Sequence, residues 1–163
     1  MMVGFMNCTT FNYKLEKPPK YKYVDNGTGV WKTFEFENGV KFKEFTSHMK
    51  FGDLPLISIS SGMDPETGKM AIADGVIAIG QRSKGVVALG QFASGYLAVG
   101  QFVTGRIAAV GQFCLAPLSI GQFSIAVAAI AQMGIVGTGI MQMGIAFFGG
   151  IGQMVLDVGK FLV

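Results

Sequence analysis

Gly85-Val-Val-Ala-Leu-Gly-Gln-Phe-Ala-Ser94 and Gly95-Tyr-Leu-Ala-Val-Gly-Gln-Phe-Val-Thr104 are consecutive copies of the ten-residue repeat that decides the fold of this chain. The repeat runs from Gly75 to Met154, and each copy contains one glutamine. Successive glutamines are ten residues apart, except for two intervals of eleven. The glutamines are Gln81, Gln91, Gln101, Gln112, Gln122, Gln132, Gln142 and Gln153.

An even period favours strands over helices. Ten residues turn an α-helix through about 1000°, so successive glutamines would lie roughly 80° apart around its axis. A strand alternates with period two, so ten residues return each position to the same side. A glycine every five residues would also cost a helix about 1 kcal/mol apiece relative to alanine. We therefore predict an all-β fold, a β-solenoid (β-helix) over residues 71–163. Residues 1–70 should form an extended arm and a β-hairpin that caps the solenoid.

The composition excludes several classes of protein. Hydrophobic residues make up 50% of the 163 residues and charged residues 14%, a balance that excludes ordinary disorder. A net charge of +3 is too small to indicate a nucleic-acid partner. Cys8 and Cys114 match no metal-binding or redox spacing; a disulfide between them stays open, and buried reduced thiols are the expectation. The first residues lack the basic region of a signal peptide, so we expect a cytoplasmic protein, with surface or membrane association left open.

Each repeat also specifies which side chains share a side. Leu97 and Val99 should lie on one side of a strand and Ala98 on the other. The large residue after most glutamines should stack at about 4.8 Å spacing, as a ladder inside the coil. We therefore predict two decads per coil, which would make room for it, whereas one would give a very thin pair of sheets. The ladder consists of Phe92, Phe102, Phe113, Phe123, Met133, Met143 and Met154.

Two further features of the repeat have structural interpretations. The glycine that ends each unit should bend the chain, and the extra residues near Ala109 and Gly150 should be bulges at corners. The glutamine row is expected to bond amide to amide along the stack. The alternative is a polar row that binds ice, a glycan or an ion.

The outward positions change character along the repeat. Two places after the phenylalanine or methionine lie Lys84, Ser94 and Thr104, and then only apolar residues. An exposed apolar patch of this extent indicates a protein or membrane contact; the alternative is that these side chains point inward and thicken the core. The predicted assembly interface comprises Leu115, Ile125, Ile135, Ile145, Phe147 and Leu156.

The segment before the repeat contains an alternating hairpin, Trp31 to Phe45. A three-residue loop at residues 37–39 sets Phe34 against Phe42 and Glu35 against Lys41, which gives favourable pairs on both sides of the hairpin. Gly39 then adopts the left-handed backbone conformation. A two-residue loop would pair these residues poorly. The phenylalanine side of the hairpin should lie on the first coil or on a neighbouring subunit, because two strands alone are marginal.

No other residues of this segment complete a reactive site. Residues 14–23 interleave basic and aromatic side chains, but their Pro-Pro pair favours a solvated extended arm over a nucleic-acid site. Asp64 and Glu66 lie in a turn-rich connector without further catalytic partners, and His48, the single histidine, should be a surface residue at the hairpin's end. We therefore expect no enzyme activity, no cofactor and no metal.

From Leu54 onward, the motifs Leu-Pro-Leu-Ile, Asp64-Pro-Glu-Thr-Gly68 and Gly75-Val-Ile-Ala-Ile-Gly80-Gln resemble a group of uncharacterised bacterial proteins with "Ile-Ala-Ile-Gly" repeats. The likeness covers about two-thirds of the chain and implies no activity. More loosely, the architecture resembles bactofilins, whose β-helical cores polymerise end to end; the repeat also resembles the heads of trimeric adhesins.

These observations favour a structural, self-assembling solenoid that forms filaments or homo-oligomers through its coil ends and apolar outer faces. One alternative is a membrane-associated protein whose repeat lies in or on lipid. The other is a ligand-binding module that uses the glutamine row or the polar side of the first repeats.

Overall fold

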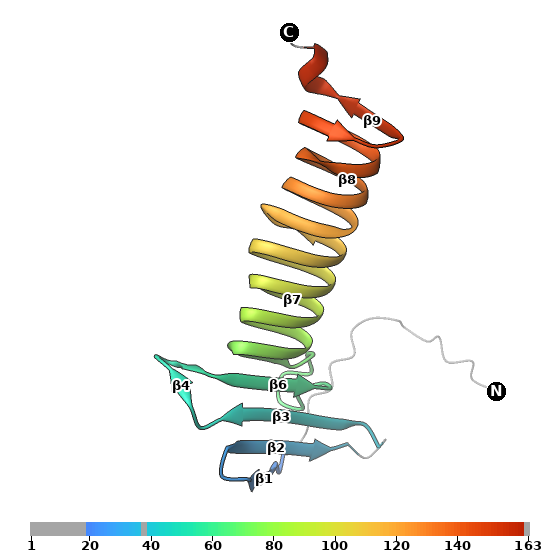
Figure 1. Cartoon of the computed structure of the whole chain (residues 1–163). Helices are drawn as coiled ribbons and strands as arrows, with labels where there is room; N and C mark the ends of the chain where they lie inside the picture. Colours follow the sequence, from blue (N-terminus) through green and yellow to red (C-terminus); the bar gives the residue numbers. More distant parts are fainter. Residues whose placement is uncertain (1–18, 37–38, 162–163) are drawn as a thin grey trace, which may run out of the picture.

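The chain forms a β-solenoid, as the repeat predicts. The computed structural model describes residues 19–36 and 39–161, and the coils follow one axis between an N-terminal sheet and the C-terminal end (Figure 1). The elements are β1 (Lys22–Asp25), β2 (Gly29–Glu35), β3 (Lys41–Ser47), β4 (Lys50–Phe51), β5 (Leu54–Pro55), β6 (Ile57–Ser61), β7 (Ile72–Leu115), β8 (Leu118–Ile151), β9 (Met154–Asp157) and the 3-10 turn η1 (Val158–Phe161).

One decad makes one coil. Where β7 meets β8, Ala108 pairs in parallel with Leu118 and Phe113 with Phe123, ten residues apart. The prediction of two decads per coil was therefore wrong. That prediction assumed that the phenylalanine ladder fills the interior, which needs a wide coil.

The interior of the earlier coils holds small side chains only. In the third coil, Ala93 and Ala98 are buried, while Phe92, Leu97 and Val99 are each about half exposed. The ten residues alternate out-in-out-in-out twice, so a coil consists of two five-residue arms such as residues 92–96 and 97–101. The phenylalanine ladder does stack, but on the outside of the coil. The prediction that it lies inside was wrong, because so short a coil has no room for a phenyl ring between its arms.

The repeated glycines occupy interior positions where successive coils approach closely. A Cβ added at Gly100 would overlap the carbonyl oxygen of Gly90, one coil earlier, and Gly90 has the same relation to Gly80. None of these three has a positive φ. These glycines therefore allow the backbones of successive coils to approach closely, a role beyond the bend that the sequence predicts.

The interior positions exchange roles in the later coils. Glycines replace the small inward residues at Gly134, Gly139 and Gly144, while Val136 and Met141, at former glycine positions, become buried. A Cβ at Gly144 would lie 2.6 Å from the Met141 sulfur, and one at Gly134 would lie 3.4 Å from a Val136 methyl. The larger side chains thus take the space that the glycines vacate, and the interior stays filled.

Both eleven-residue intervals arise at the same corner. The additional residues are Ile107 and Phe148, which lie between the two arms of their coils and are 52% and 85% exposed. The pairing of Ala108 with Leu118 and the bond from the Thr138 hydroxyl to the Gly149 carbonyl show that the regular register resumes directly afterwards. The extra residues thus lie outside the regular register, as expected, and their form as corner bulges stays a prediction.

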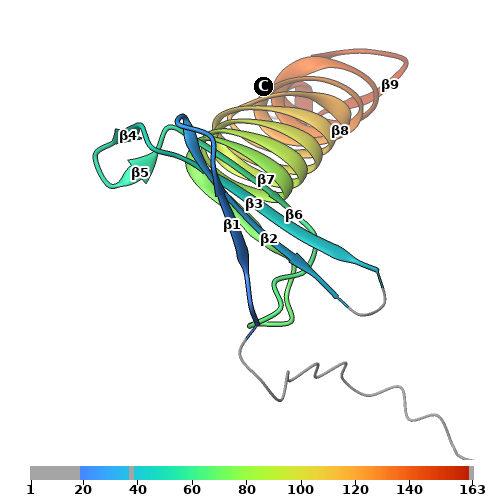
Figure 2. The same cartoon turned by 90° about the horizontal axis from the view of Figure 1, so that it is seen from below.

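The N-terminal strands continue the sheet of the solenoid. The sheet order is β1-β2-β3-β6-β7-β8-β9, and β6 pairs in parallel with the first coil, Ile57 against Ile77 and Ser60 against Gly80. The antiparallel strands lie across the end of the coils (Figure 2). They cover a strand edge that would otherwise offer unpaired backbone groups.

The predicted hairpin register is confirmed. Phe34 pairs with Phe42 and Glu35 with Lys41, and Gly39 has a φ of 81°. The phenylalanine side of the hairpin packs against Tyr21 rather than the first coil, since the Tyr21 ring centroid lies 6.0 Å from those of Phe34 and Phe42. Asn38 lies outside the described residues.

Gly100→Ala tests the close approach of coils. We expect it to destabilise the protein by several kcal/mol, because the new methyl group overlaps a backbone oxygen that cannot move without disturbing the ladder. Ala131→Gly, at the equivalent position two turns after Gly111, should cost no more than about 1 kcal/mol. Urea denaturation of both variants measures the difference, and equal stabilities would contradict the explanation.

Met141→Ala and Met143→Ala form a matched pair for the exchange of core positions. Met141 is 2% exposed and Met143 is 45% exposed. Removing the Met141 side chain should cost about 2–5 kcal/mol, because it leaves a cavity beside Gly144. Removing that of Met143 should cost under about 1 kcal/mol. Thermal unfolding of the two variants compares them; a larger loss for Met143→Ala would show that the inward and outward positions are wrongly assigned.

Candidate interaction surface

The outer side of one arm forms a continuous apolar surface, which we call the aliphatic face. Its residues flank the buried alanine of arms such as residues 97–101, and among the described residues none of them is charged. The face comprises Ile77, Ile79, Val87, Leu89, Leu97, Val99, Ala108, Val110, Leu118, Ile120, Ala128, Ile130, Thr138, Ile140 and Ile151.

The aliphatic face extends into the N-terminal sheet. Ile59 pairs with Ile79, Phe45 with Ile59, and Trp31 with Phe45, and paired residues of neighbouring strands project to the same side. The Trp31 and Phe45 rings are 4.9 Å apart. One row of apolar side chains therefore crosses the sheet from β2 to the last coils.

The outer side of the other arm, which we call the phenylalanine face, is polar at one end and apolar at the other. It consists of the outward residues of arms such as residues 92–96. In the first coils it carries Arg82, Lys84 and Arg106, and the Arg106 guanidinium lies 5.4 Å from the Tyr96 ring. No charged residue follows until Asp157. This face therefore changes from a hydrated surface to a charge-free one near Arg106.

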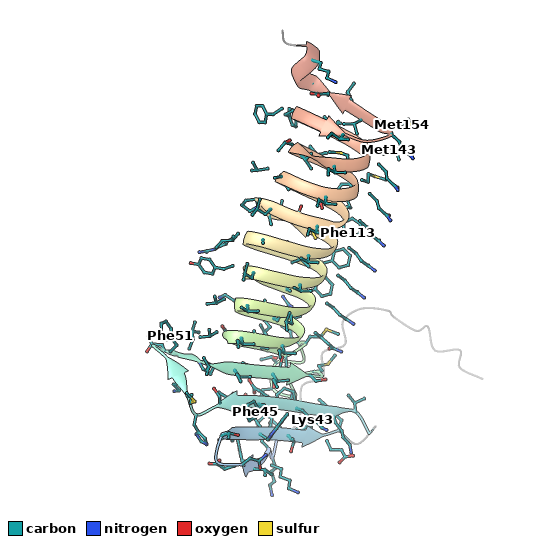
Figure 3. All side chains as sticks on the ribbon, viewed as in Figure 1. Lys43, Phe45, Phe51, Phe113, Met143 and Met154 are labelled. Carbon is teal, nitrogen blue, oxygen red and sulfur yellow. The ribbon has the colours of Figure 1, made fainter. Side chains whose placement is uncertain are left out.

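The phenylalanine ladder is a regular stack on this face. Ring centroids of Phe92 and Phe102 are 5.2 Å apart and those of Phe102 and Phe113 5.1 Å apart, with 9° between the planes in each case. Phe123 continues the stack at 5.5 Å. Phe113, Met143 and Met154 follow one another along one edge of the coils (Figure 3). Such ring pairs add about 0.5–1.5 kcal/mol each beyond area burial.

The residues of the predicted assembly interface lie on the outside of the coils. Leu115, Ile125, Ile135, Phe147 and Leu156 are between 42% and 53% exposed. Ile145 is half-buried. They all belong to the phenylalanine face, so the alternative in which they point inward and thicken the core does not apply. Their role in assembly stays a prediction.

The glutamines form a row at the corner that follows the aliphatic face. All of them are exposed except Gln81, which is half-buried. A shallow groove separates the row from the adjoining ladder at Phe113, Phe123, Met133 and Met143. Among the described side-chain hydrogen bonds, none joins two of these amides. The amide-to-amide bonding therefore stays a prediction, and the amides point to the surroundings.

The polar residues singled out before the repeat are structural. Asp64 accepts hydrogen bonds from the Tyr21 hydroxyl at 3.1 Å and the Thr67 hydroxyl at 3.0 Å, which hold the connector against the sheet. Burial and these carboxylate bonds raise the pKa of Tyr21 well above its usual range. The end of the predicted solvated arm is part of the sheet, because strand β1 begins at Lys22. The residues of β1 are exposed, as the prediction requires. Residues 14–18 lie outside the described residues.

The other titratable groups complete no reactive cluster. His48 is exposed at the end of β3 and bonds Asp25 at 3.0 Å, which holds the pKa of that carboxyl below its usual value. Cys114 is an inward residue of its coil, and burial raises the pKa of its thiol, which disfavours the reactive thiolate. Cys8 lies outside the described residues. Over residues 19–36 and 39–161, three or more histidine, cysteine or acidic side chains nowhere gather as a metal ligand set.

The sequence contained a signal for the aliphatic face that the initial interpretation did not use. Residues on either side of the inward alanine position are valine, isoleucine or leucine in the first three coils, although the other arm carries charges there, and only Ala108, Ala128 and Thr138 depart from this pattern up to Ile140. The sequence analysis assigned Leu97, Val99 and their equivalents to one side of the strand but based the predicted interface on the positions that change along the repeat. Positions that stay uncharged in every coil are as informative as positions that change.

Within the described ranges, no helix is long and apolar enough to cross a lipid bilayer. No protein-family model, curated protein or solved structure matches this chain. The likeness to "Ile-Ala-Ile-Gly" repeat proteins and to bactofilins therefore stays a resemblance in sequence pattern, and the functional argument depends on the surfaces themselves.

Proposed function

We propose that this chain is a structural protein that assembles laterally with copies of itself through the apolar outer faces of its solenoid. The observation that carries the proposal is the aliphatic face, which remains uncharged along the whole repeat. Parallel sheets occur almost only with both sides covered, and valine-, isoleucine- and leucine-rich strands are typical of that condition. Here the coil interior covers one side, and a second copy would cover the other.

The two faces of the early coils support a protein partner there. In the early coils, the aliphatic face presents only apolar residues such as Leu97 and Val99, while the opposite arm alternates exposed rings such as Phe92 with polar residues such as Ser94. An arm with polar positions on one side and a wholly apolar arm on the other favour a contact that covers the apolar arm. Two such faces, each a flat row of branched side chains, can pack together as the faces of two sheets do.

The ends of the solenoid support lateral contact over end-to-end stacking. At the N-terminal end, β6 pairs with the antiparallel strand β3, so the first coil has no free edge there. At the C-terminal end, β9 is followed directly by η1, and Gly159 of this turn bonds the Asp157 carboxylate at 3.2 Å. Both ends therefore continue into other structure, which leaves the sides of the coils as the broad apolar surface.

Val99→Lys tests lateral assembly. Val99 is 45% exposed in the middle of the aliphatic face, so a charge there should disrupt packing between copies without disturbing the interior. Ser94→Lys is the matched control, since it places the same side chain on the opposite arm of the same coil. Light scattering after gel filtration in detergent-free buffer should show oligomers for the wild type and the control, and a shift toward monomer for Val99→Lys. A monodisperse wild-type monomer would refute the proposal.

A second candidate function, insertion of the later coils into a membrane, is favoured by a different observation. From Ile107 to Leu156 the chain has no charged residue, and Arg106 and Asp157 bracket this belt. The belt contains five glutamines and therefore five coils, or about 24 Å at about 4.8 Å per coil. The belt could therefore span most of the hydrocarbon core of a bilayer, which is about 30 Å thick.

The hydrogen bonding of a solenoid is compatible with hydrocarbon around its sides. Each backbone bond of the belt runs to the coil before or after, as between Ala109 and Ser119, so no coil has an open edge toward its sides. Valine, isoleucine, phenylalanine and methionine cover both faces of this belt, as Val127, Ile130 and Met133 do in one coil. The exposed glutamines are the unfavourable contribution, since amides in hydrocarbon need partners.

Val127→Lys and Val86→Lys separate this candidate from assembly in water. Val127 is 65% exposed inside the belt, and Val86 occupies the same position in the second coil, outside the belt. A lysine at the centre of hydrocarbon costs about 2.5–3.5 kcal/mol, so flotation with phosphatidylcholine vesicles should fall more than about tenfold for Val127→Lys only. Membrane insertion would be excluded if the wild-type protein does not float with the vesicles and a carbonate wash releases it from membranes.

A further inference from the structure

The phenylalanine face contains a groove that is independent of the proposed assembly surface. The groove has a volume of about 480 Å³ and runs along the solenoid axis over the first coils. One wall is the row that begins with Ile72 and Arg82 and continues with the stacked phenylalanines from Phe92 to Phe123. The other wall is the row Lys84, Ser94, Thr104, Leu115 and Ile125.

The cross-section of the groove suits one unbranched chain. The two walls are two residues apart along each strand, or about 6.6 Å. Between them, the side chains of Ala93 and Val103 point into the coil, so the floor is backbone. Opposite Phe92 and Phe102 the facing residues are the small Ser94 and Thr104, which leaves the groove open there. Flat ring faces on one side and a smooth floor below match a methylene chain better than a bulky or branched ligand.

The two ends of the groove differ in charge. At the N-terminal end, Arg82 and Lys84 belong to the same arm and project on either side of the buried Ser83. In the part of the chain that the structure describes, neither cation forms an ion pair. Asp74 precedes Lys84 by one coil in the same row, so the end carries two positive charges and one negative. The opposite end, at Phe123 and Ile125, is apolar.

We infer that this groove binds a long-chain fatty acid, with the carboxylate between Arg82 and Lys84 and the acyl chain along the phenylalanine stack. The net single positive charge at one end matches one carboxylate, and an arginine offers it two parallel hydrogen bonds. From the coil of Arg82 to that of Phe123 the groove advances four coils, or about 19 Å, which accommodates an extended chain. The aliphatic face lies on the other arm, so lateral assembly leaves the groove open.

The groove also accounts for an asymmetry in the repeat. Each glutamine is followed by an outward position, yet only the second coil has a cation there, Arg82, and only that coil has a lysine in the facing row. A merely hydrated surface would need no such pairing of two cations at the start of an aromatic stack. The pairing gives the groove a direction, with a polar head site and an apolar tail site.

Equilibrium dialysis of the full-length protein against radiolabelled oleate, below its micelle concentration, tests the inference. Oleyl alcohol has the same chain without the charge, and acetate has the charge without the chain. We expect saturable binding of oleate, binding of oleyl alcohol at least about tenfold weaker, and no measurable binding of acetate. Equal affinity for oleate and oleyl alcohol, or no saturable oleate binding, would overturn the assignment.

Matched variants locate the site. The double variant Arg82→Gln/Lys84→Gln should weaken oleate binding by about tenfold or more, because both partners of the carboxylate are lost. Arg106→Gln, which removes a cation from the same face but outside the groove, should change it less than about twofold. Phe102→Ser should weaken oleate and oleyl alcohol alike. Circular dichroism confirms that each variant keeps its β-structure.

Two outcomes would identify another occupant and contradict the inference. If Arg106→Gln weakens binding as much as the double variant, oleate responds to the general positive charge of the face and not to the groove. If the protein binds vesicles that contain phosphatidylglycerol but not dissolved oleate, the cations recognise a bilayer surface. The oligomeric state, measured in the same samples, keeps a failure of this inference separate from a failure of lateral assembly.

Discussion

The short circumference of the coil is the constraint on which the rest of the structure depends. Ten residues per coil leave two five-residue arms so close together that alanine, serine, glycine, valine and cysteine fill the space between them. Every phenylalanine of the repeat must therefore lie outside, and its stacking partner is the equivalent residue of the next coil. A protein with such an interior buries little side-chain area, so hydrogen bonds between coils and the outer ladders contribute a large share of its cohesion. The same constraint makes the outer surface apolar.

The period of the repeat and the local pairing rules could be predicted from the sequence, whereas the width of the coil could not. An even period specifies strands whatever the width, and the hairpin register follows from the requirement that Lys41 meet Glu35 and Phe42 meet Phe34. A ten-residue repeat is compatible with one or two copies per coil. The usual preference for large apolar side chains inside then favours the wider coil. Here that preference fails, because the small residues are the ones that alternate with regular spacing toward the interior.

The exposed surfaces divide the described part of the solenoid into zones of different polarity. The aliphatic face is uniform from end to end, which suits contact with an identical face. The phenylalanine face changes from cationic in its first coils to charge-free in its later coils. The candidate groove spans this transition, and its walls derive from the same two rows that the sequence analysis followed. The members of these rows could be predicted from the sequence, but their side of the coil could not, since facing inward and facing outward have the same period.

The exchange of interior positions near Val136 and Met141 shows that the coils are tolerant of rearrangement as long as the enclosed volume is conserved. Each coil contacts only the one before and the one after, about ten residues away in the chain. Contacts so close in sequence favour rapid, stepwise folding. During synthesis, the sheet built by β1 to β6 can serve as a template on which each newly emerged decad adds one layer. Growth of the solenoid can then keep pace with the ribosome, and the apolar rows become occupied in order from the N-terminal end.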